Sequence, residues 1–212
     1  RGSADLSAPN GSQGSLLLDP RNILITNLDT GSQDAVASND VFAENSTASA
    51  KFDADQVTTL LASGALVLQA NNDIIVDEAI TSTATNNLTL TAGRSVFLNS
   101  TITNTNGDIT ITANAAGATA AQRDTGAAVI AMATGTSLLA GTGNITLEMD
   151  DSSVANANAA GMHLDTITTT GTLLIDMDET TGDVFNDVSR VSSTSLITAG
   201  KLLVDMEDEL GD

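Results

Sequence analysis

The stretch from residue 87 to residue 112 reads NLTLTAGRSVFLNSTITNTNGDITIT, and it contains one short repeating unit in full. Three runs in it carry β-branched and aliphatic residues that alternate in character: 88–91, 96–98 and 101–103. Turns rich in Gly, Asn and Ser separate these runs, and the run 109–112 starts the pattern again. Period-2 alternation indicates strands rather than helix. Three short strands in a unit of about 21 residues predict a solenoid, in which stacked units bury one another's apolar face.

The same unit recurs along most of the chain. The first inward apolar residue of each unit serves as a marker, and the markers are Leu66, Leu88, Ile109, Ile145, Leu173 and Leu202. They are separated by steps of 22, 21, 36, 28 and 29 residues. The first two steps match compact coils, and the longer steps match coils that carry loop insertions.

We therefore predict an all-β fold, a right-handed parallel β-helix with loop insertions and one short helix. Residues 1–13 are expected to be a tag remnant and lead-in, and residues 14–212 a single β-helix segment of a longer protein. Insertions are expected near 30–50, 113–128 and 152–162, the first of them from Thr30 to Ala50. The helix is predicted from Asp53 to Ala62, where apolar residues have helical spacing and an aspartate can cap the first turn.

Composition supports a narrow core. The chain of 212 residues has no Trp and no Tyr and only 4 Phe, so the apolar side chains are almost all aliphatic. It has no Cys, which excludes disulfides, thiolate metal sites and cysteine nucleophiles. We expect no membrane insertion, because no run of apolar residues is long enough to span a bilayer.

The charge balance is strongly acidic. Lys and Arg number 7 against 27 Asp and Glu, a formal net charge of -20. Such a chain is repelled by nucleic acid and by anionic membrane surfaces, so neither is expected as a partner.

A family resemblance is carried by two stretches. Residues 14–25, from Gly14 to Ile25, resemble the LLLDPxNIxI strand of filamentous-haemagglutinin-like exoproteins from bacterial two-partner secretion systems. Residues 57–74 are similar to the helix-then-coil that follows in that family. The resemblance implies a secreted β-helical fibre at the bacterial cell surface, exported through an outer-membrane partner. It also implies adhesion to a protein or glycan on a host or neighbouring cell.

A repeated acidic motif is the strongest candidate for a ligand site. Segments 145–151, 173–179 and 202–208 each place a methionine between acidic residues. Alternation predicts that Met149, Met177 and Met206 point inward and that two columns of carboxylates point outward. In stacked coils, like charges about 5 Å apart repel by roughly 1 kcal/mol per pair even in water. A calcium-binding ladder would remove that repulsion, with the ligands Glu148, Asp150, Asp176, Asp178, Asp205 and Glu207.

A solvated acidic face that maintains solubility is the plainer interpretation of the same residues. It is favoured by the absence of both the glycine-rich nonapeptide calcium repeat and the EF-hand loop. No cofactor is therefore required, and calcium remains the one candidate.

Threonine pairs form a second pattern, at 89–91, 101–103, 110–112 and 166–168. Regular rows of hydroxyls on a flat β-helix face are a feature of some ice-binding proteins. We expect these pairs to fall on different faces of different coils, which makes ordinary solvent-facing threonine the preferred interpretation and ice binding the lesser one.

The residues for catalysis are not gathered in the sequence. Lys51, Arg94, Arg123, Arg190 and Lys201 are scattered singly, and His163 is the chain's one histidine. We therefore expect no enzyme activity, and three classes stay open: an adhesive segment with binding loops, a calcium-stabilised spacer, and a polysaccharide-active fragment. Release of reducing ends or unsaturated sugars from polysaccharides would identify the third class.

Overall fold

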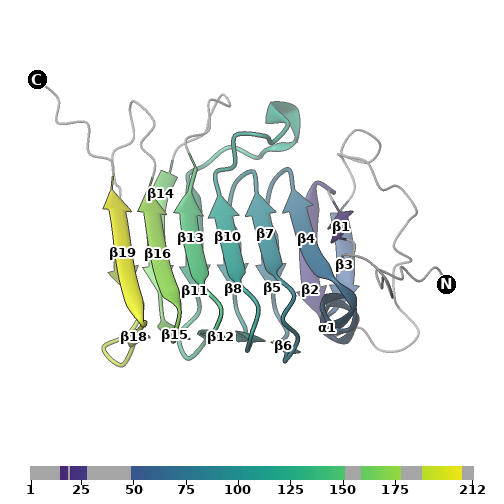
Figure 1. Cartoon of the computed structure of the whole chain (residues 1–212). Coiled ribbons are helices and arrows are strands. Elements are labelled where there is room, and N and C mark those ends of the chain that lie inside the picture. The colour runs from purple at the N-terminus through teal and green to yellow at the C-terminus, as the bar shows by residue number, and fades with distance from the viewer. Residues whose placement is uncertain (1–14, 19, 28–48, 151–158, 178–187, 207–212) are drawn as a thin grey trace, which may run out of the picture.

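The computed structural model describes residues 15–18, 20–27, 49–150, 159–177 and 188–206. The lead-in 1–13 and most of the first predicted insertion therefore lie outside the described residues. Figure 1 shows the rest as a stack of coils with arrows running side by side.

Three parallel sheets form the walls of the stack, and we name them A, B and C. Sheet A contains, in spatial order, β1 (Ser15–Leu18), β4 (Ala65–Ala70), β7 (Leu88–Ala92), β10 (Ile109–Ala113), β13 (Ile145–Met149), β16 (Thr172–Met177) and β19 (Lys201–Met206). Sheet B contains β17 (Val188–Arg190), β14 (Ala159–Leu164), β11 (Ala128–Met132), β8 (Val96–Leu98), β5 (Ile74–Val76), β2 (Asn22–Thr26) and β3 (Ser49–Asp53). Sheet C contains β18 (Ile197–Thr198), β15 (Thr166–Thr169), β12 (Ser137–Gly141), β9 (Ile102–Asn104) and β6 (Ile80–Ser82). From β4 onward the chain visits A, B and C in turn, so the predicted parallel β-helix is confirmed.

The marker residues form one column along sheet A, as the repeat predicted. Backbone pairing joins Leu66 to Leu88, Leu88 to Ile109, and so on through Ile145 and Leu173 to Leu202. All but Leu202 are fully buried, whereas Leu202 lies on the last strand of the sheet and is exposed. The unequal steps between markers are therefore differences in loop length and not in register.

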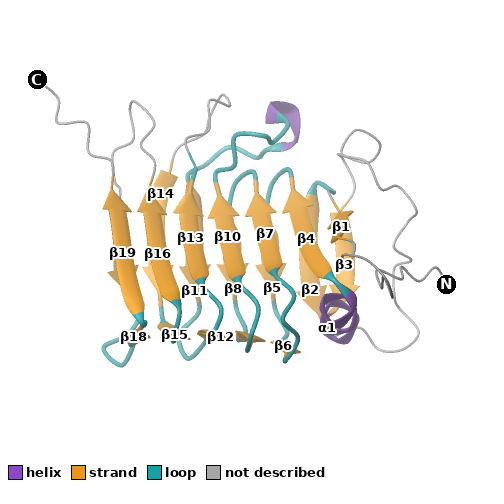
Figure 2. Cartoon of the chain, viewed as in Figure 1, coloured by secondary structure: helices purple, strands orange, loops and turns teal. Residues whose placement is uncertain are grey.

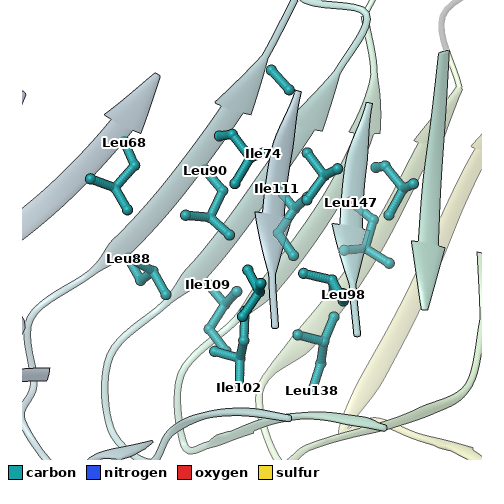
Figure 3. Packing of buried hydrophobic residues seen from close by; sticks show 14 of the residues in the cluster. Leu68, Ile74, Leu88, Leu90, Leu98, Ile102, Ile109, Ile111, Leu138 and Leu147 are labelled. Carbon is teal, nitrogen blue, oxygen red and sulfur yellow. The ribbon is translucent and has the colours of Figure 1, made fainter. Parts of the chain in front are cut away.

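Matching columns line the other two walls. In sheet B the buried column runs through Ile74, Val96, Ile130 and Met162, and in sheet C through Ile80, Ile102, Leu138 and Ile167. Figure 3 shows Ile74, Ile102 and Leu138 among the aliphatic side chains that stack between the sheets. Each fully buried Leu or Ile contributes roughly 1.5–3 kcal/mol relative to exposure, which is how a core with so few aromatic residues is stabilised.

The predicted helix is confirmed as α1 (Ala54–Ser63). Asp53 is its N-cap, because the Asp53 side chain accepts a hydrogen bond from the Asp55 backbone N–H at 2.9 Å. The apolar face of α1 is buried through Val57 and Leu61, and the helix packs mainly against β6. It thereby occupies, in the first coil, the place that a sheet C strand occupies in later coils.

Two predicted insertion boundaries are wrong. The first insertion was expected to run to Ala50, but strand β3 already begins at Ser49 and pairs with β2. The third was expected to run to Met162, but β14 begins at Ala159 and Met162 is fully buried. The small residues before Met162 show no alternation from which a strand could be predicted. The strand is also irregular there, because Gly161 has a φ of 113° and the pairing with β11 shifts beside it. The second insertion lies between β10 and β11 as residues 114–127, one residue shorter at each end than predicted, and it contains one short 3-10 turn, η1 (Ala120–Gln122).

A column of glycines explains why a glycine precedes so many sheet A strands. A Cβ added at Gly107 would lie 2.0 Å from the Asn86 carbonyl oxygen, and one at Gly143 would lie 2.1 Å from the Gly107 oxygen. Beside this column, the Asp108 Oδ1 accepts the Asn144 backbone N–H at 2.7 Å. The corner between sheets C and A is therefore too tightly stacked for side chains at the glycine positions.

The expectation that the threonine pairs fall on different faces is correct between sheets A and C and wrong within each of these sheets. The pairs at 89–91 and 110–112 lie in register on β7 and β10 of sheet A. The pairs at 101–103 and 166–168 both belong to sheet C. Coil lengths vary, yet the strands of a sheet stay aligned because the extra residues leave the coil at its corners. The pairing of β11 with β14 and that of β12 with β15 each contain one irregularity.

Candidate functional site

The acidic motif has the predicted register on sheet A. Glu148 pairs with Asp176, and Asp176 pairs with Asp205, on consecutive strands β13, β16 and β19. Adjacent strands lie about 4.8 Å apart, so the three carboxylates form one outward column. Met149 and Met177 are fully buried on the other side of the same strands, as predicted.

The carboxylates of this column differ in surroundings. Glu148 is half-buried, and its Oε2 accepts a hydrogen bond from the Thr112 hydroxyl at 2.7 Å. Asp176 is half-buried and Asp205 is exposed. In the second predicted column, Asp150 Oδ2 accepts the Ala116 backbone N–H at 2.8 Å, so it holds the loop after β10.

Asp178 and Glu207 lie outside the described residues. Among the residues that are described, no group of three or more His, Asp or Glu side chains is arranged to hold a metal ion. The calcium ladder therefore stays a prediction, carried by the register of one column.

The corner between sheets A and B is the other candidate, because all the late insertions leave the coil there. In two compact coils this corner takes three residues, 71–73 and 93–95. In the three following coils the connection is longer, 114–127, 150–158 and 178–187. The strands that bound these three connections place the two ends of each connection at the same corner of the β-helix.

The described insertion, 114–127, folds back over the compact turns of earlier coils. Thr119 donates its backbone N–H to Asn71 Oδ1 at 2.8 Å, and Asp124 donates its backbone N–H to Asn72 Oδ1 at 2.9 Å. Arg21, in the first coil, donates to the Asp124 carboxylate at 2.5 Å. Figure 2 shows this loop with η1 above the ends of β10 and its neighbours. The loop therefore joins coils that lie far from it in the sequence, and we name residues 114–127 with these contacts the clamp.

Arginine side chains hold the clamp in place. Arg123 is 7% exposed, and it donates to the Gly93 carbonyl at 2.7 Å and to Asn114 Oδ1 at 2.8 Å. Arg94 forms an ion pair with Asp73 through two hydrogen bonds. The hydrogen bond with Asp73 raises the pKa of the Arg94 guanidinium above its ordinary value, although burial acts in the opposite direction.

These contacts correct the view that the basic residues are scattered. Arg94 and Arg123 are brought to one corner with Arg21, although 73 residues separate Arg21 from Arg94. Sequence reasoning missed this cluster because the partners are carbonyl and amide groups of turns. The polar run Asn71-Asn72-Asp73, which is buried at the end of a strand, was the available signal.

A small groove of about 170 Å³ lies beside the clamp, between sheet A and the loop. Its polar side chains are Gln69, Thr91 and Asp150, and small residues such as Ala115 and Ala118 complete the lining. The groove can accept hydrogen bonds and one positive charge, but within the described lining it presents a single carboxylate.

His163 lies on β14 and not in an insertion. Its Nδ1 is 2.7 Å from the hydroxyl oxygen of Ser189 on the neighbouring strand β17. The contact joins adjacent strands across sheet B.

No protein-family model, no curated protein and no solved structure matches the chain. In the described part of the chain, no helix is long and apolar enough to cross a membrane.

Proposed function

We propose that the chain is a structural and adhesive segment of a larger secreted bacterial surface protein. In this role the β-helix is the rigid part, and the loops at the corner between sheets A and B contact a protein or glycan on a host or neighbouring cell. One observation carries the proposal: three consecutive coils place their insertions at the same corner. Loops positioned by a rigid scaffold are where proteins most often place binding residues.

The hydrogen bonds that hold the described loop in place support its role in presenting binding residues. Residues 114–127 are tied to three earlier coils by Arg21, Asn71, Asn72 and Arg123. Exposed residues at the tip, such as Ala120 and Ala121, are thereby held in a fixed position. A preorganised loop loses less conformational entropy when it binds than a free one does.

The resemblance to filamentous-haemagglutinin-like exoproteins supports the same role. The stretch from Gly14 to Ile25 includes β1 and most of β2, the first two strands of the β-helix. On this proposal the parent protein is exported through an outer-membrane partner and acts at the cell surface. The net charge of -20 favours a partner other than nucleic acid or an anionic membrane.

We propose no catalytic role. A glycoside-cleaving site needs two carboxyl groups across the bond, and the described lining of the groove provides Asp150. Incubation with a panel of polysaccharides is expected to release no reducing ends and no unsaturated sugars.

The adhesive role is tested with beads coated with the chain, applied to epithelial cells, to bacterial cells and to a glycan array. Wild-type beads are expected to bind one of these surfaces. A variant with Ala120→Asp and Ala121→Asp changes the loop tip without removing the clamp, and it is expected to lose that binding. Thr83→Ala with Thr105→Ala is the matched control at the corner between sheets C and A, where both residues are exposed. Equal binding by wild type and tip variant would contradict a role for this loop, and no binding by wild type would contradict adhesion.

A calcium-stabilised spacer is the second candidate, favoured by the register of Glu148, Asp176 and Asp205. A cation bound only by the folded state raises the melting temperature. Circular dichroism melts in excess EDTA and in calcium are expected to differ for wild type and to coincide for Asp176→Asn. Coincident melts of the wild-type chain would refute the ladder.

A further inference from the structure

The outward face of sheet C differs from the rest of the surface because its described positions carry mostly hydroxyls and no charge. One column runs through Thr81, Thr103, Leu139, Thr168 and Thr198, which are paired in register across five strands. A second column beside it runs through Thr101, Ser137 and Thr166 to the exposed Leu196. Every one of these positions except Leu139 and Leu196 carries a hydroxyl group, and none of them is buried.

The other two sheets carry charges on their outward faces. Sheet A presents Glu148, Asp176 and Asp205 on its last three strands, and sheet B presents Lys51 on β3. In a chain with a net charge of -20, one uncharged face across five strands is a marked departure. Charged side chains maintain solubility and keep protein surfaces apart, so their absence here favours contact with a neutral surface.

The spacing of the hydroxyls is fixed in two directions. Neighbouring strands are about 4.8 Å apart, and alternate residues along a strand are about 6.7 Å apart. Threonine is β-branched and has few χ1 choices, so each hydroxyl and methyl is held in a defined direction. A hydroxyl both donates and accepts hydrogen bonds, which suits a partner made of water molecules. Oxygen atoms on surface planes of hexagonal ice repeat with spacings of this order.

The face is also accessible to a flat partner. The long connections of coils four to six leave at the corner between sheets A and B, which is opposite sheet C. The connections that border sheet C are short; those from sheet C to sheet A comprise residues 83–87, 105–108, 142–144, 170–171 and 199–200.

We propose that the outward face of sheet C binds the surface of ice. The hydroxyl rows and methyl groups order water in the lattice spacing, and the charged side chains of sheets A and B stay in solution. This binding uses residues apart from the loop corner, so it stands independently of the adhesive role.

The test measures ice-crystal shape and ice recrystallisation in the presence of the purified chain. Wild type is expected to facet growing crystals and to slow recrystallisation. Thr103→Tyr with Thr168→Tyr places two bulky side chains on sheet C and is expected to abolish both effects. The matched control is Thr89→Tyr with Thr110→Tyr, the same change at half-exposed threonines of sheet A, and it is expected to keep both effects.

Circular dichroism melts show whether each variant is folded as the wild type is. Round, unfaceted crystals with the wild-type chain would overturn the proposal, and so would equal loss of activity in the sheet A and sheet C variants when both are folded. Binding of wild type to insoluble cellulose without any effect on ice would also overturn it, since the partner would then be a polysaccharide surface.

Discussion

Replacing Gly143 by alanine tests the tight stacking of the coils most directly. The added Cβ would lie 2.1 Å from the Gly107 carbonyl oxygen, 2.5 Å from its carbon and 3.1 Å from the Asp108 backbone nitrogen. All three are backbone atoms of the preceding coil, so no side chain can rotate away. The two coils must separate at this corner, where the Asn144 N–H bonds Asp108.

The expected cost follows from overpacking. Forcing extra atoms into a packed site costs about 1–3 kcal/mol, and a backbone obstacle places Gly143→Ala near the upper end. For a chain of this size each kcal/mol lowers the melting temperature by about 2–4 °C, so we expect a decrease of roughly 6–12 °C.

Substitutions at two other glycines separate the cost of the steric clash from the cost of backbone strain. Gly135 has a φ of +87° and open space around its Cβ position, so Gly135→Ala adds backbone strain alone, about 1–2 kcal/mol. Gly117 has open space and no left-handed backbone, so Gly117→Ala is expected within about 0.5 kcal/mol of wild type.

Far-UV circular dichroism is the assay, because the chain has no Trp or Tyr for fluorescence. The expected order of melting temperatures is Gly117→Ala, then Gly135→Ala, then Gly143→Ala as the lowest. A Gly143→Ala variant that melts with Gly117→Ala would refute the reasoning, since the coils would then be able to separate at little cost.

The remaining predictions concern the clamp and the helix. Asp73→Asn removes the partially buried partner of Arg94 and is expected to lower the free energy of unfolding by about 3 kcal/mol. Asp124→Asn acts at the more exposed pair with Arg21 and is expected to lower it by under about 1 kcal/mol. Equal losses of stability for the two variants in urea unfolding would contradict this difference. Because the pKa of Arg94 is raised in the folded state, its contribution to stability is present below the ordinary arginine pKa and is lost only as the pH rises through the folded-state pKa. A measurement of stability against pH should therefore show no step from Arg94 in the neutral range. Asp53→Ala removes the N-cap of α1 and is expected to cost about 1 kcal/mol, and an unchanged urea midpoint would show that packing alone holds the helix.

Local patterns predicted the repeating part of this fold well. The column from Leu66 to Leu173, the helix capped by Asp53 and the register of Glu148 with Asp176 all follow from alternation and spacing. Each depends on residues close in sequence or on a unit repeated along the chain. Such patterns are visible because every coil buries its apolar face in the same way.

The misses have a different origin. β3 and the start of β14 lack clear alternation, and their pairing with β2 and β11 makes them strands. The clamp made by Arg123 depends on a loop that contacts three earlier coils, so its partners carry no motif of their own.

By itself the sequence determined the β-helix, its inward aliphatic columns and the coils that carry insertions, because a period-2 pattern repeated in stacked units has one way to bury its apolar side chains. Only the tertiary structure decided which faces the threonines share and which coils the 114–127 loop clamps. Both depend on the point at which the chain pairs with the stack again after a corner connection of variable length. The number of residues in that connection does not specify this point.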